Sequence, residues 1–218
     1  MDLTTLYSNR FDEADQAWKL KVWQVLWRRV FSRHVAPGDT VLDVGAGYCE
    51  FINAVQSKRR IAVDLNPDTA RRAAPGVEVH SVPAQELSFL GDASVDVTFS
   101  SNFFEHLPTK TMLTQVVREI HRVLKPGGKL IVMGPNVRLL AGAYWDYYDH
   151  HLPLSEKSVG ELLAIAGFEP TQVEARFLPY TVKSSAPRWP WLVEAYLSLR
   201  PISSFVLGRQ FLVVARRP

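Results

Sequence analysis

The stretch from residue 41 to residue 51 constrains the fold more than any other part of the chain. A short apolar run around Asp43 is followed at once by Gly45 and Gly47. Such a run ending in a glycine pair is typical of a buried parallel strand, a tight turn and a helix start in an open α/β sheet. Glycine lets the backbone turn sharply and approach a ligand closely. The stretch therefore predicts a ligand pocket at the carboxyl end of a central strand.

A dinucleotide is the obvious ligand for such a turn, and Glu50 argues against it. In the pattern G-x-G-x-x-G the third glycine would stand at position 50. A carboxylate there lies beside the helix start that should receive a pyrophosphate, which is a poor place for a second anion. A nucleotide-dependent oxidoreductase thus remains an alternative, and a ligand without phosphate fits better.

Length and composition favour one domain. The chain has 218 residues, of which 47% are hydrophobic, so it can bury a full core. We divide it into an N-terminal helical lid (1–37), a cofactor-binding core (38–135) and a segment that carries a substrate insertion and completes the sheet (136–218). The single cysteine excludes an internal disulfide. No secretory signal and no apolar run long enough to span a membrane is visible, so we expect a cytoplasmic protein.

The rest of the chain alternates between strand and helix patterns. Strands are expected at 41–44, 60–63, 77–82, 95–101, from 129 onward, at 168–177 and at 211–215, and helices at 12–34, 48–56, 109–124, 155–167 and 189–200.

Asp64 stands at the carboxyl end of the second expected strand, 21 positions after Asp43. That interval is close to the roughly 20 residues at which an acid meets ribose hydroxyls in doubly wound folds. A carboxylate accepts two hydroxyl hydrogen bonds well. The other interpretation is a turn or helix-capping acid before Pro67. Because strand, glycine turn and acid are in register, we favour the ribose role.

Four motifs occur in order between residues 38 and 135, and together they resemble class I S-adenosylmethionine-dependent methyltransferases. They are Asp43-x-Gly45-x-Gly47-x-Cys49, then Asp64, then Glu105-His106-Leu107, and then the Lys125-Pro126-Gly127-Gly128 turn. The resemblance implies S-adenosyl-L-methionine as the cofactor. It also implies an α/β fold: a doubly wound, seven-stranded, mostly parallel sheet with one antiparallel strand and helices on both faces.

The cofactor contacts implied by the resemblance lie at the ends of the first four strands. They are Asp43, Gly45, Ala46, Gly47, Cys49, Asp64, Leu65, Ala84, Gln85 and Asn102. The chain departs from the family at one place: aligned on Leu87 and Phe89, the family's adenine-binding acid falls on Pro83. This leaves the Ala84 backbone and Gln85 as the adenine contacts. The only cysteine is expected to lie against the pocket.

The acceptor side is expected in an aromatic insertion at residues 143–153. Its Tyr144, Trp145 and Tyr148 are candidate substrate contacts, and they suggest a small-molecule, glycosylated or lipid-linked acceptor. We favour O-methylation, for which a base must remove the hydroxyl proton.

Histidine is the natural base near neutral pH, so the candidates are His106, His150 and His151. Helix capping or packing explains His106 as well, and exposure in a loop explains the other two. Asp146 lies four residues before His150, but this spacing is too weak to predict metal ligands, so we expect no metal.

The partner remains partly open. A net charge of +3 does not by itself demand nucleic acid. Residues 179–218, however, are basic, with Lys183, Arg188, Arg200, Arg209, Arg216 and Arg217 against the single acid Glu194. An RNA- or membrane-surface-associated methyltransferase is therefore the alternative. We expect a small-molecule acceptor rather than nucleic acid, and leave peripheral membrane contact and the oligomeric state open.

Overall fold

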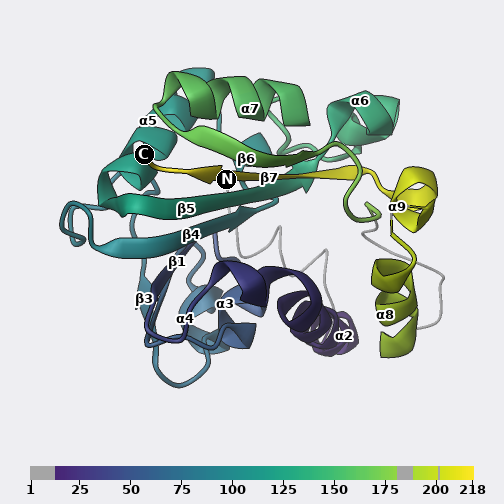
Figure 1. The fold of residues 1–218 in the computed structure, drawn as a ribbon, viewed down its shortest axis with the longest axis horizontal. Coiled ribbons are helices and arrows are strands. Elements are labelled where there is room, and N and C mark those ends of the chain that lie inside the picture. The colour runs from purple at the N-terminus through teal and green to yellow at the C-terminus, as the bar shows by residue number, and fades with distance from the viewer. Residues whose placement is uncertain (1–12, 181–188, 201) are drawn as a thin grey trace.

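A computed structural model describes residues 13–180, 189–200 and 202–218, which build one seven-stranded sheet between two layers of helices (Figure 1). The strand order is β3-β2-β1-β4-β5-β7-β6. The strands are β1 (Thr40–Val44), β2 (Arg59–Val63), β3 (Val77–His80), β4 (Val95–Ser101), β5 (Leu124–Pro135), β6 (Glu169–Glu174) and β7 (Gln210–Arg216).

The pairing of the strands confirms the expected fold class. β1 pairs in parallel with both β2 and β4, and β4 pairs in parallel with β5. β7 runs antiparallel to its two neighbours, β5 and β6. The strand order reverses between β1 and β4, and ligands of open α/β sheets bind outside the carboxyl ends of the strands at such a point. The fold thus places the site where the glycine turn stands.

The helices cover both faces of the sheet (Figure 1). They are α2 (Glu13–Leu26), continued by a π-helical turn η1 (Trp27–Phe31) and a 3-10 turn η2 (Ser32–His34), then α3 (Glu50–Ala54), α4 (Asp68–Arg72), η3 (Phe104–His106), α5 (Lys110–Val123), α6 (Val137–Leu140), η4 (Ala141–Asp146), α7 (Glu156–Ile165), α8 (Pro190–Ser198) and α9 (Ile202–Leu207).

Two helix starts follow the rules for capping. The Thr109 hydroxyl accepts a hydrogen bond from the Met112 N–H at 3.1 Å and so begins α5 where the sequence predicts. Ser155 begins α7 in a reciprocal capping box with Ser158.

Each face of the sheet has its own apolar core. α5 and α7 pack on one face, and α2, η1, α3 and Leu197 of α8 pack on the other. On the second face Phe31, Phe51 and Phe99 form an aromatic cluster, in which the rings of Phe51 and Phe99 stack 3.7 Å apart. The middle of the sheet is therefore buried on both sides, and the carboxyl edge is where a ligand can enter.

The structure also corrects several expected boundaries. α3 begins at Glu50 and ends at Ala54, inside the predicted range of 48–56, and β3 ends at His80 rather than at residue 82. The short helices α4, α6 and α9 were not predicted, since four to six residues are too few to show a helical period. Residues 1–12 of the predicted lid, including Asp12 at the start of the helix expected at 12–34, lie outside the described residues.

Across the described ranges, every helix is too short or too polar to cross a lipid bilayer.

Candidate active site

The glycine turn after β1 is held in a conformation that requires glycine. Gly45 has a φ of +75°, and a Cβ built there would lie 2.3 Å from Cγ of Phe103, in the loop after β4. The N–H groups of Gly45 and Ala46 both donate to the Val63 carbonyl, at 2.9 and 3.2 Å. The turn is therefore tied to the end of β2 and covered by the loop after β4.

Asp64 lies at the end of β2, directly beside this turn. One carboxylate oxygen accepts the Gly47 N–H at 2.7 Å, and the other accepts the Asn66 N–H at 2.8 Å. Each oxygen keeps capacity for a further hydrogen bond, as the hydroxyls of a ribose require. The next side chain, Leu65, is 53% exposed and offers an apolar surface for a flat ring.

Asn66 adds a further polar group at this place. Its side chain is buried, and among the described residues the Nδ2 atom has no hydrogen-bond partner. A buried donor without an acceptor is costly unless a ligand or water satisfies it.

Three carboxyl groups gather around the turn. Burial raises the pKa of Asp43 well above its ordinary value, and the nearby charges of Asp64 and Glu50 raise it further. Burial also raises the pKa of Glu50 and that of Asp64. Two cations act against this shift at Glu50: Lys19, whose Nζ lies 3.9 Å from the Glu50 carboxylate, and Arg72.

This acidic surrounding is unfavourable for a pyrophosphate, because like charges close together in a poorly solvated site repel strongly. It suits a cofactor with a positive sulfonium and an ammonium group. The glycine turn, the carboxylate for a ribose and the exposed Leu65 fit the remaining parts of S-adenosylmethionine. The residues present thus fit this cofactor better than a dinucleotide.

Cys49 is completely buried at the start of α3, with a φ of 63°. Its Sγ lies 3.6 Å from the Thr69 carbonyl of α4, and burial raises the pKa of the thiol. The residue stands in the turn, and its thiol is shielded by α4; a place against the cofactor pocket stays a prediction. Alkylation of the thiol therefore depends on local opening of the protein, since a buried thiol is inert.

The other predicted cofactor residues lie along the carboxyl edge. Asn102, with a φ of +49°, follows β4 and donates its N–H to the Met133 carbonyl of β5 at 2.9 Å. Ala84 is buried in the loop after β3, and Gln85 lines a shallow hollow with Gln115 of α5. Asn102 therefore lies next to the β4–β5 end of the pocket, whereas Gln85 borders the face covered by α5.

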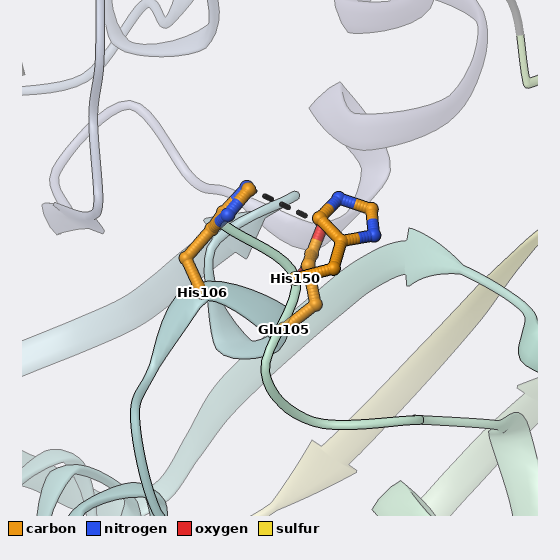
Figure 2. Close-up of side chains that lie close together, drawn as sticks. All are labelled: Glu105, His106 and His150. Carbon is orange, nitrogen blue, oxygen red and sulfur yellow. Dashed lines mark ion pairs between the residues drawn. The ribbon is translucent and has the colours of Figure 1, made fainter. Parts of the chain in front are cut away.

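The insertion brings two of the three candidate bases together. His106 of η3 and His150 of the insertion have ring centroids 5.0 Å apart, and the side chain of Glu105, also of η3, lies close to both rings (Figure 2). The Nδ1 atom of His106 is 3.0 Å from the Asp149 carbonyl and 3.1 Å from its carboxylate. His151 is exposed, and its N–H donates to the Glu105 carbonyl at 2.8 Å.

The charges around His106 favour its protonated form. Burial alone would lower its pKa, but the hydrogen bond with Asp149 and the charges of Glu105 and Asp149 together raise it above the ordinary value. Burial raises the pKa of Glu105, which is 2% exposed. A proton on Nδ1 shared with Asp149 leaves Nε2 as the acceptor in the neutral ring.

Glu105, His106 and His150 could also hold a metal ion. Their ligand atoms lie within 4.8 Å of one another. Ligands of zinc lie about 2.0–2.2 Å from the ion, so neighbouring ligand atoms are about 3.4 Å apart. The Nε2 atom of His106 and the Glu105 carboxylate lie 4.0 Å apart, so these two side chains would have to move closer to share a zinc ion. Asp146, the acid that the sequence paired with His150, is exposed while His150 is buried.

The candidate substrate residues divide into two kinds. Tyr144 has no exposed surface: its hydroxyl donates to the Leu152 carbonyl and accepts the Leu154 N–H, so it holds the insertion together. Trp145 is more than half exposed and Tyr148 is 90% exposed. Trp145 and Tyr148 remain candidates for substrate contact, whereas contact by Tyr144 would require the insertion to move.

Several residues of this site were not predicted. Tyr180 lies next to Tyr147 of the insertion, with ring centroids 6.0 Å apart. Burial raises the pKa of Tyr180, and the neighbouring Tyr147, Glu105 and Tyr144 raise it further. Tyr180 follows β6 by six residues and carries no motif. The sequence does not identify Asp149 as the partner of His106, because this contact depends on the insertion folding back onto η3.

Comparisons with known proteins agree with this geometry. Residues 42–132 match a family model described as a methyltransferase domain. An uncharacterized methyltransferase of Mycobacterium sp. (strain KMS) is 31% identical over 199 residues, with 81% of this chain and 76% of that protein covered. A probable S-adenosylmethionine-dependent methyltransferase of Mycolicibacterium smegmatis is 32% identical over 163 residues, with 72% of this chain and 61% of that protein covered.

Some curated relatives are longer than this chain, which spans less than two thirds of the mycolicibacterial protein. Among solved structures, a SAM-dependent methyltransferase from Archaeoglobus fulgidus has the same fold, with a TM-score of 0.68, 19% identity, and 90% of this chain and 94% of that chain covered. Fold, motif order, acidic pocket and relatives all lead to one assignment. The chain belongs to the class I family of S-adenosylmethionine-dependent methyltransferases.

Proposed function

We propose that this chain transfers a methyl group from S-adenosylmethionine to a hydroxyl oxygen of a small-molecule, glycosylated or lipid-linked acceptor. The observation that carries the cofactor half of the proposal is the group of Asp43, Glu50 and Asp64 around the glycine turn, because it favours a cationic, phosphate-free ligand. The cofactor, when bound, supplies an electrophilic methyl group. The protein holds donor and acceptor in line and excludes water.

We assign proton removal to His106. Its Nδ1 is fixed by Asp149, its side chain keeps partial contact with solvent, and its neutral Nε2 accepts the hydroxyl proton as the new oxygen–carbon bond forms. The charges of Asp149 and Glu105 then stabilise the imidazolium. Asp149 and His150 are positioning residues in this scheme, and the exposed His151 is the weaker candidate. We propose no metal ion, since His106 Nε2 and the Glu105 carboxylate lie 4.0 Å apart, farther than two ligands of one zinc ion.

The cofactor role is tested by replacing Asp64 with alanine and measuring the binding of S-adenosylmethionine by calorimetry. We expect a loss of about 2–4 kcal/mol, the value of one or two charge-assisted hydrogen bonds. Asp68→Ala is the matched control, because Asp68 lies four residues on and pairs with Arg71 at the surface. Equal affinity of Asp64→Ala and the parent protein would remove Asp64 from the ribose role.

The acceptor is tested by a screen of hydroxyl-bearing metabolites with a radiolabelled methyl donor. Mass spectrometry of the labelled product then locates the methyl group. Methylation of carbon or nitrogen would contradict the proposed oxygen chemistry while leaving the cofactor assignment intact.

A further inference from the structure

Helices α8 and α9 present an apolar surface to solvent. Five apolar side chains of this hairpin are each more than half exposed, and we call them the α8–α9 surface: Leu199, Ile202, Phe205, Val206 and Leu207. Ile202, Phe205 and Val206 follow the i, i+3, i+4 spacing and so share one side of α9. Contiguous exposed apolar patches on a protein mark a site of interaction with a partner or a membrane.

An arginine-rich hollow adjoins this surface. The hollow has a volume of about 870 Å³, and its lining includes Arg29, Arg33, Arg176 and Arg200 against the single carboxylate Glu174. Phe205 belongs both to the lining of the hollow and to the α8–α9 surface.

Some of this positive charge is neutralised and some is not. Arg200 forms an ion pair with Glu174, and Arg29 lies 3.5 Å from Glu194. Arg176 donates to the Phe205 carbonyl at 3.1 Å and stacks over the Phe205 ring. Within the described ranges, no carboxylate lies within ion-pair distance of Arg33 or Arg176. The hollow thus keeps a positive charge beside an apolar surface.

We propose that the α8–α9 surface binds an anionic phospholipid membrane, with the apolar side chains entering the headgroup region and the arginines binding lipid phosphates. Apolar side chains next to cationic ones are the combination that holds proteins in the plane of an anionic interface. Two stacked tryptophans at the start of α8, Trp189 and Trp191, are more than half exposed and of the type enriched at such interfaces.

Other occupants fit this surface less well. A twofold dimer would bring two copies of the same arginine cluster together, and RNA would gain nothing from the exposed aliphatic side chains of α9. A lipid surface satisfies both the charge and the apolar area.

The position of the surface agrees with a role in presenting the acceptor. α9 leads into β7, whose first residue Gln210 pairs with Pro135 at the carboxyl end of β5, and Figure 1 shows α8 and α9 at this end of the sheet. Lipid contact there would bring a lipid-linked acceptor to the edge that holds Asp64 and His106. This consequence for the acceptor rests on the proposed function, whereas membrane binding does not.

The test is flotation of the full chain with vesicles of phosphatidylcholine alone and of phosphatidylcholine mixed with phosphatidylglycerol. We expect binding to the anionic vesicles that weakens with salt. The double variant Phe205→Ser, Val206→Ser should bind at least about tenfold more weakly, because two apolar side chains no longer enter the interface. Arg33→Gln should weaken binding about fivefold, the equivalent of about 1 kcal/mol for one basic residue at an anionic surface.

Two matched controls locate the effect. Ile165→Ser removes a side chain as exposed as Phe205, 72% against 73%, from the end of α7. Lys58→Gln removes one positive charge just before β2, which lies in the half of the sheet away from β7 and β6. Both controls should float like the parent chain.

Any of four results would overturn the proposal. The first is flotation of the Phe205, Val206 double variant at the parent level, and the second is equal binding to both kinds of vesicle. The third is a parent chain that is dimeric in solution and does not float, while the double variant is monomeric. RNA binding that needs Arg33 but not Phe205 would likewise assign the surface to a nucleic acid. Calorimetry should show that the same variants bind S-adenosylmethionine with unchanged affinity. This measurement distinguishes a failure of the cofactor assignment from a failure of the membrane proposal.

Discussion

Asp43 is a residue whose carboxylate we expect to serve cofactor binding but to lower the stability of the fold. It is 3% exposed on β1, and burial together with Asp64 and Glu50 raises its pKa. A carboxyl group that is harder to ionise in the folded state destabilises the fold at neutral pH. Proteins retain such groups where function requires them.

We therefore expect Asp43→Asn to be more stable than the parent chain at pH 7 and weaker in cofactor binding. The gain should be absent below about pH 4, where the carboxyl is protonated in both states, and should grow as the pH rises through the raised pKa of Asp43. Melting at several pH values checks this, with about 2–4 °C expected for each kcal/mol gained. A variant less stable than the parent at every pH would show that the carboxylate is a net stabilising group.

Titration of His106 should affect the stability of the protein and the rate of methyl transfer in opposite directions. Its pKa is raised in the folded state, so the protonated ring stabilises the protein relative to His106→Gln. That advantage should be complete below about pH 6.5 and lost as the pH rises through the folded pKa. Methyl transfer needs the neutral ring, so the rate should rise across the same window, and His106→Gln should lose about 100- to 10,000-fold in rate.

Asp149→Asn is the matched variant for this prediction, because removing the negative partner should shift the rate profile of the enzyme to lower pH. A chelator such as EDTA should leave the rate unchanged. A rate profile that does not respond to Asp149, or one that collapses with EDTA, would contradict the role of His106 as base.

At the scale of elements, the turn between β1 and α3 depends on the loop after β4. Gly45→Ala combines a left-handed φ with a clash against Phe103. Gly127→Ala, in the β5 turn, has a similar φ of +81° but no atom within 4 Å of the new Cβ. The backbone term alone should cost about 1–2 kcal/mol at Gly127. Gly45→Ala should cost more and should also weaken cofactor binding, as measured by denaturant unfolding and calorimetry. An equal loss of stability in the two variants would mean that the Phe103 side chain moves away from the new Cβ at little cost.

The elements that the sequence predicted well are those with a long repeated pattern or a defined end. β4 lies at residues 95–101 as predicted, and α5 and α7 start after the caps Thr109 and Ser155. α9 has six residues, and its apolar positions resemble a buried strand as much as an exposed helix. The α8–α9 surface therefore could not be predicted, because exposure of an apolar side chain is decided by what packs against it.

The residues of the candidate site likewise fall into those that the sequence could predict and those that it could not. Asp43, the glycines and Asp64 follow one another along two neighbouring strands, so their sequence spacing fixes their distance. The contact between His106 and Asp149 joins residues 43 positions apart through the part of the insertion that follows η4 and forms no helix or strand. Local spacing could name His106 and His150 as candidates, but only the fold of the insertion shows which acid each histidine meets.

For the whole molecule, cofactor binding should appear as added stability of the single sheet. The site draws on β1, β2 and β4, which are central strands shared by the cores on both faces. A ligand that binds only the folded state at 100 times its Kd adds about 2.7 kcal/mol. For a chain of this length that amounts to an increase of about 5–10 °C in Tm.

S-adenosylhomocysteine should produce this shift in Tm. NAD should not, because the pyrophosphate of NAD would meet Asp43, Glu50 and Asp64. The Phe205, Val206 double variant should keep the full shift, since its substitutions lie on α9 and not in the pocket. A shift with NAD alone would overturn the cofactor assignment.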